Sequence, residues 1–102
     1  MNLQDAIDHV AATYPFTVEH YPELAGKTSE EAFTFAVRHN TLHIAKELGR
    51  MSAVCEAMDH GEPIDRAALE KATVKMFINV LEGVKLQGLD ADSLLKLLPK
   101  YM

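Results

Sequence analysis

Hydrophobic residues recur every three or four positions through most of the chain, which is the spacing that places them on one face of an α-helix. The first such segment covers about residues 2–13, with four apolar residues on one face: Leu3, Ile7, Val10 and Ala11. Asn2 is a suitable cap for this helix. The connection that follows contains aromatic residues among prolines and a glycine, so we expect an irregular, packed segment in which Phe16, Val18 and Tyr21 lie over the helices.

A second helix is expected over about residues 29–60. Thr28 supplies a cap ahead of two acidic residues, and no proline follows until Pro63. At 1.5 Å per residue this helix is roughly 45 Å long. Seven of its residues follow alternating steps of four and three, the spacing that keeps one stripe facing a partner helix: Val37, Thr41, Ile44, Leu48, Met51, Cys55 and Met58. The pattern predicts that this stripe is the core seam of the helix.

Two further helices are expected in the second half of the chain. Asp65 can cap a third helix that extends to about Gln87. Its inner stripe is expected to hold five residues: Leu69, Thr73, Met76, Val80 and Val84. Gly88 is a suitable stop, and Gly83 indicates a close helix contact. Asp90 then caps a short fourth helix that Pro99 closes.

Length and composition are typical of one folded domain. The chain has 102 residues, of which 48% are hydrophobic and 25% charged. We therefore expect a single helical domain over residues 1–102, with a short helix and packed loop in residues 1–28 and a helical core in residues 29–102. The expected architecture is an all-α, four-helix up-and-down bundle with one long central helix at about residues 29–60.

Charge and cysteine content narrow the class of protein. A net charge of -5 disfavours a general binder of nucleic acids or anionic membranes. Cys55 is the single cysteine, so no disulfide can form within the chain. A basic-then-apolar leader and an apolar run near twenty residues are both lacking, which argues against a signal peptide or a membrane span. We expect a cytoplasmic location.

One polar face of the second helix carries most of the candidate chemistry. Its members fall within an arc of about 100°, roughly opposite the apolar stripe: His39, His43, Lys46, Glu47 and Arg50. Arg50 can make paired hydrogen bonds to a phosphate or a carboxylate, while Lys46 adds a point charge. A nucleotide or another anion therefore suits this face. The simpler interpretation is that Glu47 pairs with neighbouring cations on a solvated or interface surface.

The same face also allows a metal site. His39 and His43 stand one turn apart, so both imidazoles can bind Zn²⁺, and Glu47 at the next turn can add an oxygen. Lys46 and Arg50 lie beside these groups, and their fixed charge opposes a dication unless other carboxylates compensate. Metal binding is therefore the alternative to anion binding and not the leading expectation.

Two stretches of the chain carry a resemblance to a known family. KELGRMSAVCEAMDHGE and ALEKATVKMFINVLEGVKLQGLDADSLL form a helix, a short turn, a second helix and a Gly88-Leu89-Asp90 turn into a last helix. In this order the chain from Lys46 onward resembles the MazG-like all-α nucleoside triphosphate pyrophosphohydrolases. In that family an EExxE motif on one helix and an ExxD motif on the next hold Mg²⁺ against the triphosphate, because hard carboxylate oxygens suit that ion.

The expected carboxylates are mostly missing from this chain. The family's five acidic positions fall here on one acid, three cations and an alanine: Glu47, Lys46, Arg50, Lys75 and Ala72. The resemblance therefore implies the scaffold without its Mg²⁺ site, and no catalytic residue is carried over. If the family's packing holds, Lys75 and Asn79 of the third helix face Lys46 and Arg50, and a basic cup results.

These observations favour a non-catalytic MazG-like helical protein that recognises a phosphorylated small molecule or a protein partner without a cofactor. Six residues are expected to bind the ligand: Lys46, Arg50, Lys75, Asn79, His39 and His43. One alternative is a divergent metal-dependent nucleotide pyrophosphohydrolase that uses His39, His43 and Glu47 to hold a divalent ion such as Zn²⁺. A second alternative is a small regulator or inhibitor of a larger protein.

A homodimer is also expected. The second helix carries apolar residues outside its main stripe, namely Phe33, Phe35, Leu42 and Val54. A helix roughly 45 Å long with this many apolar residues exposes more surface than three shorter neighbours can cover. A second copy of the chain is the simplest partner for that surface.

Overall fold

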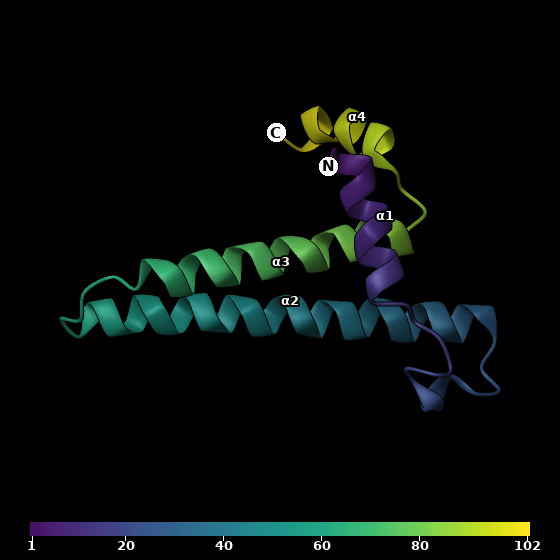
Figure 1. The fold of residues 1–102 in the computed structure, drawn as a ribbon, viewed down its shortest axis with the longest axis horizontal. Coiled ribbons are helices and arrows are strands. Elements are labelled where there is room, and N and C mark those ends of the chain that lie inside the picture. Colours follow the sequence, from purple (N-terminus) through teal and green to yellow (C-terminus); the bar gives the residue numbers. More distant parts are fainter.

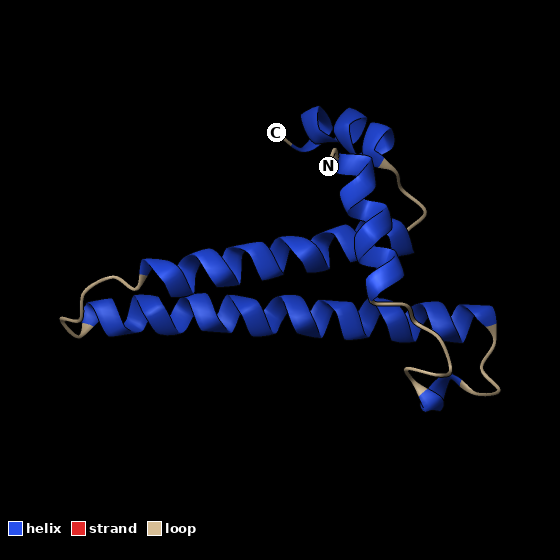
Figure 2. Ribbon diagram, viewed as in Figure 1, coloured by secondary structure: helices blue, strands red, loops and turns tan.

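The computed structural model describes residues 1–102 as an all-helical chain without strands (Figures 1 and 2). Its elements are α1 (Leu3–Thr13), the short 3-10 helix η1 (Pro22–Leu24), α2 (Ser29–Asp59), α3 (Arg66–Leu86) and α4 (Ala91–Tyr101). The all-α class expected from the sequence is confirmed. None of the helices combines the length and the apolar character that crossing a bilayer requires.

Local capping explains where the helices begin and end. The side chains of four residues accept a backbone N–H of the first turn, as the sequence predicts: Asn2, Thr28, Asp65 and Asp90. Gly61 and Gly88 follow the ends of α2 and α3 with φ angles of 90° and 73°. At the end of α2, Glu62 N–H donates to the Ala57 carbonyl at 3.0 Å, which closes the last turn.

The end of α4 differs from the expectation. Pro99 does not close this helix but lies inside it, and α4 continues to Tyr101. The φ angle of proline is already helical, and proline near a helix end removes a single backbone hydrogen bond. The last residues therefore remain helical despite the proline.

The four helices do not contribute equally to one core. α2 and α3 lie side by side as an antiparallel hairpin, α1 crosses the C-terminal part of α3, and α4 packs on α1 (Figure 1). The buried apolar cluster lies between α1 and α3 and consists of Ile7, Val10, Leu81 and Val84. Lys85 of α3 also pairs with Asp8 of α1 at 2.9 Å. The antiparallel arrangement expected for four helices is thus found in the α2/α3 hairpin, with α1 and α4 laid across one end.

The apolar stripe expected as the core seam of α2 is not buried, and this prediction was wrong: Val37, Ile44 and Met51 are half-buried and the other four residues are exposed. Leu48 is 56% exposed and Met58 is 42% exposed, and Thr41 and Cys55 are also exposed. The buried residues of α2 are instead Ala36, Asn40 and Glu47. At 100° per residue, the mean direction of these residues lies about 70° around the helix from that of the apolar stripe.

The third helix shows the same displacement. Thr73 is exposed and Val80 is 41% exposed, although both belong to the stripe expected to face inward, while Ala72 is buried. Small residues let the two helices approach closely: a Cβ at Gly83 would lie 3.0 Å from the Asn40 amide nitrogen. The close contact expected at Gly83 is confirmed. Val84, at the end of the same stripe, is buried as expected, in the core between α1 and α3. The most closely packed positions of the hairpin are thus small or polar, while most residues of the two apolar stripes are half-buried or exposed.

Candidate functional site

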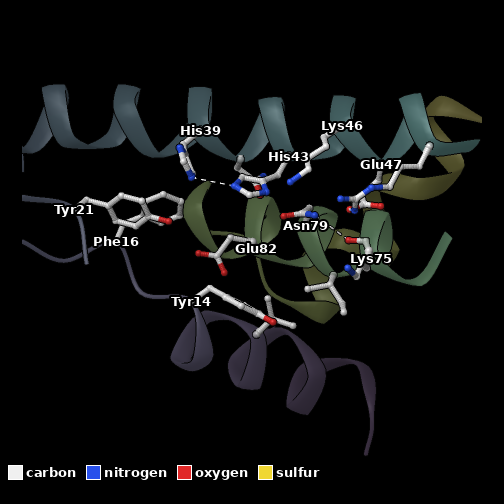
Figure 3. Close-up of a pocket in the computed structure, with 14 residues that line it drawn as sticks. Tyr14, Phe16, Tyr21, His39, His43, Lys46, Glu47, Lys75, Asn79 and Glu82 are labelled. Carbon is white, nitrogen blue, oxygen red and sulfur yellow. Dashed lines mark hydrogen bonds and ion pairs between the residues drawn. The ribbon is translucent and has the colours of Figure 1, made fainter. Parts of the chain in front are cut away.

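A cavity of about 330 Å³ lies between α2 and α3, with part of α1 and of the following connection forming its outer wall (Figure 3). All six residues expected to bind a ligand line it: His39, His43, Lys46, Arg50, Lys75 and Asn79. We call this cavity the cup. Its volume falls in the range of small-molecule sites. Residues one turn apart on each helix share a face, so the antiparallel pairing brings the two polar stripes together.

The cations lie toward one end of the cup. Arg50 is paired with Glu47, whose carboxylate accepts from the guanidinium. The remaining ion pair of the structure, between Lys85 and Asp8, involves no residue of the cup, so the ammonium groups of Lys46 and Lys75 are both free of a carboxylate partner. Two unpaired ammonium groups beside a half-exposed guanidinium form a positively charged end.

Two buried carboxyl groups also line the cup. Glu47 is 5% exposed and Glu82 is 6% exposed, and in both residues the Oε2 atom has no hydrogen-bond partner. Burial raises the pKa of the Glu82 carboxyl above its ordinary value. When both acids are ionised, the positive charges of Lys46, Arg50 and Lys75 exceed the two negative charges by one. Protonation of Glu82 increases that excess to two.

Glu82 lines the cup but is not among the ligand residues expected from the sequence. The spacing of Lys75, Asn79 and Glu82, in steps of four and three, places all three on one helix face. That polar periodicity was the available signal. It was passed over because the apolar stripe of α3 was taken as the inner face.

Two histidines of α2 line the cup between Glu47 and the aromatic end (Figure 3). Nε2 of His43 and Nε2 of His39 are 3.0 Å apart, so one ring must donate a hydrogen bond and the other must accept it. Burial, followed by the neighbouring charges of His39 and Lys46, lowers the pKa of His43 below its ordinary value. His43 is therefore uncharged at neutral pH and can gain a charge on acidification.

The other end of the cup is aromatic. Phe16 and Tyr21 stack with ring centroids 5.1 Å apart, and Tyr21 meets His39 edge-on at 5.0 Å. Figure 3 shows this pair at one side of the cup and Lys75 at the other, with His43 and Asn79 between them. Phe16 and Tyr21 thus pack over α2 as expected. Val18 does not, since it is 50% exposed.

The side chains of the alternative metal set do not assemble into a ligand cluster. The structure contains no group of three His, Cys, Asp or Glu side chains that could hold a metal ion. His39 and His43 lie together, but the Oε1 atom of Glu47 is directed to Arg50.

The five positions at which the resemblance places carboxylates gather in one region. Four of them line the cup: Lys46, Glu47, Arg50 and Lys75. The fifth, Ala72, is buried and lines a neighbouring hollow that shares Glu47, Arg50 and Lys75 with the cup. Comparisons with protein families, with curated proteins and with solved structures find no match to this chain.

Proposed function

We propose that the chain is a non-catalytic, MazG-like helical binding protein whose cup holds a phosphorylated small molecule, most simply a nucleotide. The observation that carries this proposal is a single cavity with unpaired Lys46 and Lys75 near one end and the stacked Phe16 and Tyr21 at the other. Ammonium and guanidinium groups bind phosphate, and aromatic rings stack on a planar base.

The geometry of α2 supports an elongated ligand. His39 and Lys46 are seven residues apart on one face, which is about 10 Å along the helix axis. A molecule with an aromatic group at one end and a phosphate at the other can contact both. Glu47 and Glu82 line the same cavity, and their carboxyl groups are candidates to accept hydrogen bonds from amino or hydroxyl groups of a ligand that displaces the side chains covering them.

The charges of the cup support binding without metal-assisted hydrolysis. Mg²⁺ bridges carboxylates to phosphate oxygens in phosphohydrolases. At the corresponding positions this chain has Lys46, Arg50 and Lys75, which supply positive charge directly. We propose that these fixed cations replace the metal ion as the phosphate-binding group, and that the reaction which the metal would assist is absent.

Calorimetric titration tests this function. ATP should bind in the presence of EDTA, and adenosine should bind at least tenfold more weakly because it lacks the phosphates. Replacing Lys46 with Met should weaken ATP binding by about tenfold to a hundredfold, which corresponds to the loss of a charge-assisted hydrogen bond. Lys96→Met is the matched control, because Lys96 lies on α4 outside the cup.

Two outcomes would contradict the proposal. Binding that requires Mg²⁺ would show that the fixed cations do not replace the ion. Release of pyrophosphate or phosphate with Mg²⁺, Mn²⁺ or Zn²⁺, lost in His43→Ala, would favour the divergent hydrolase instead.

The cytoplasmic location remains part of the proposal, supported by the single unpaired cysteine, Cys55. The homodimer also remains a proposal, and it concerns the side of the α2/α3 hairpin away from the cup.

A further inference from the structure

The side of the hairpin away from the cup carries exposed uncharged residues, most of them apolar. On α2 they include Leu48 and Cys55, and on α3 they include Thr73, Phe77 and Val80. At 100° per residue, these positions lie about 130° around α2 and about 180° around α3 from the residues that line the cup. Since the cup is on one side of both helices, this surface, which we call the apolar face, is on the other side of both.

The apolar face is open in the single chain. Leu48 is 56% exposed and Phe77 is 52% exposed, and neither α1 nor α4 covers them. The stripe of α2 from residue 37 to residue 58 follows steps of four and three and contains no charged residue. This is the spacing with which helices pack against partner helices. On α3, Arg66 and Glu70 lie at the N-terminal end of the same face, so the charges are confined to its edge. The central part of this surface fits an apolar partner and not an acidic or basic one.

The single chain also has too much surface for a compact domain of its size. Its accessible area is 7421 Å², whereas a folded monomer of 11.3 kDa is expected to expose about 5,700 Å². Its radius of gyration is 16.3 Å, against about 12.8 Å for a compact chain of this length. The excess of about 1,700 Å² is in the range that each subunit buries in an obligate homodimer.

We propose that a second copy of this chain covers the apolar face, so that two α2/α3 hairpins form a four-helix bundle between the subunits. A two-fold dimer brings the same patch of both subunits together, and a face with an apolar centre is complementary to itself. The two cups then open on opposite sides of the dimer, away from the interface. This arrangement does not depend on the ligand of the cup.

The position of Leu48 relative to Leu42 provides a matched test. Both are exposed leucines of α2, at 56% and 60%, but they lie about 120° apart around the helix. Sedimentation equilibrium should show a dimer for the unmodified chain. Leu48→Glu should weaken dimerisation at least a hundredfold, because a carboxylate would be buried without a partner. Leu42→Glu should leave the dissociation constant within about threefold.

Cys55 gives a second readout that requires no substitution. Its side chain is exposed in the single chain and lies on the apolar face. Its rate of reaction with a maleimide should fall as the protein concentration rises through the dimer dissociation constant. This measurement decides the question even if Leu48→Glu fails to fold.

Three results would overturn the interface. The first is a chain that sediments as a monomer at every concentration. The second is a dimer that Leu42→Glu dissociates and Leu48→Glu does not. The third is a dimer in which Cys55 reacts as fast as it does in dilute protein.

Discussion

The two sides of the α2/α3 hairpin differ in chemistry although the same two helices build them. The side with the cup buries polar groups, including Glu47 and Glu82 at 5% and 6% exposure. The opposite side leaves Leu48 and Phe77 more than half exposed. A helix pair optimised only for its own stability would bury the apolar side chains and expose the carboxyl groups. The pattern of this chain is the reverse, which supports the proposals of a ligand on one side and a partner on the other.

The largest expected effect comes from the core that holds α1 against the hairpin. Ile7 is fully buried between α1 and α3, and Val10 and Tyr14 of the same segment line the cup. Ile7→Ala should lower the free energy of unfolding by about 2–5 kcal/mol, measured by urea denaturation. It should weaken ATP binding while the dimer persists, because the apolar face does not involve α1. If Ile7→Ala abolishes the dimer but leaves ATP binding intact, the assignment of ATP binding to the cup and of dimerisation to the apolar face is contradicted.

A charge reversal in the cup should have the next largest effect. Lys75→Glu replaces an unpaired cation with an anion beside the bound phosphate, so ATP affinity should fall by about a hundredfold in calorimetry. Lys96→Glu, on α4, should change the affinity less than threefold. Equal losses in both variants would mean that only the net charge of the protein matters.

The affinity for ATP should also depend on pH through His43. Burial and nearby cations lower the pKa of His43, so it is neutral at pH 7.5 and becomes protonated only below its ordinary range. A bound phosphate favours the protonated ring and raises that pKa. Affinity should therefore increase as the pH falls from 7.5 to 5.5, by up to about tenfold. His43→Gln should flatten most of this profile, and an unchanged profile would exclude His43 from the site.

The smallest effect concerns the buried carboxyl group of Glu82. Its pKa is raised in the folded protein, so its contribution is most favourable below the ordinary pKa and is lost as the pH rises through the raised value. Glu82→Gln should therefore gain stability relative to the parent chain as the pH increases, reaching about 1 kcal/mol at pH 8. Denaturation at pH 4 and pH 8 measures this. If the difference in free energy of unfolding between Glu82→Gln and the parent chain is the same at pH 4 and pH 8, deprotonation of Glu82 does not destabilise the folded protein.

The helices themselves were predictable because their signals are local. Caps such as Thr28 and Asp65 and stops such as Gly88 act on neighbouring residues, so their effects do not depend on the rest of the fold. The prediction for Pro99 was wrong although the effect of a proline is also local. Its helical φ angle near the chain end outweighed the single hydrogen bond that it removes.

The face that each helix buries in the chain could not be predicted from the hydrophobic pattern. The apolar stripe through Leu48 has the spacing of a core seam, but that spacing does not specify which partner covers it. In the chain itself the buried residues of α2 are instead Ala36, Asn40 and Glu47. The six expected ligand residues nevertheless line one cavity: four come from the polar stripe of α2, and Lys75 and Asn79 were placed opposite them by the resemblance. Glu82 was missed since its burial is a property of the assembled cup.

Titration of ATP into the Leu48→Glu variant in EDTA tests most directly the claim that the two sides act independently. We predict a monomer that binds ATP within about threefold of the affinity of the parent chain, without added metal. A folded Leu48→Glu monomer that no longer binds ATP, or that binds it only when Mg²⁺ is restored, would contradict the account.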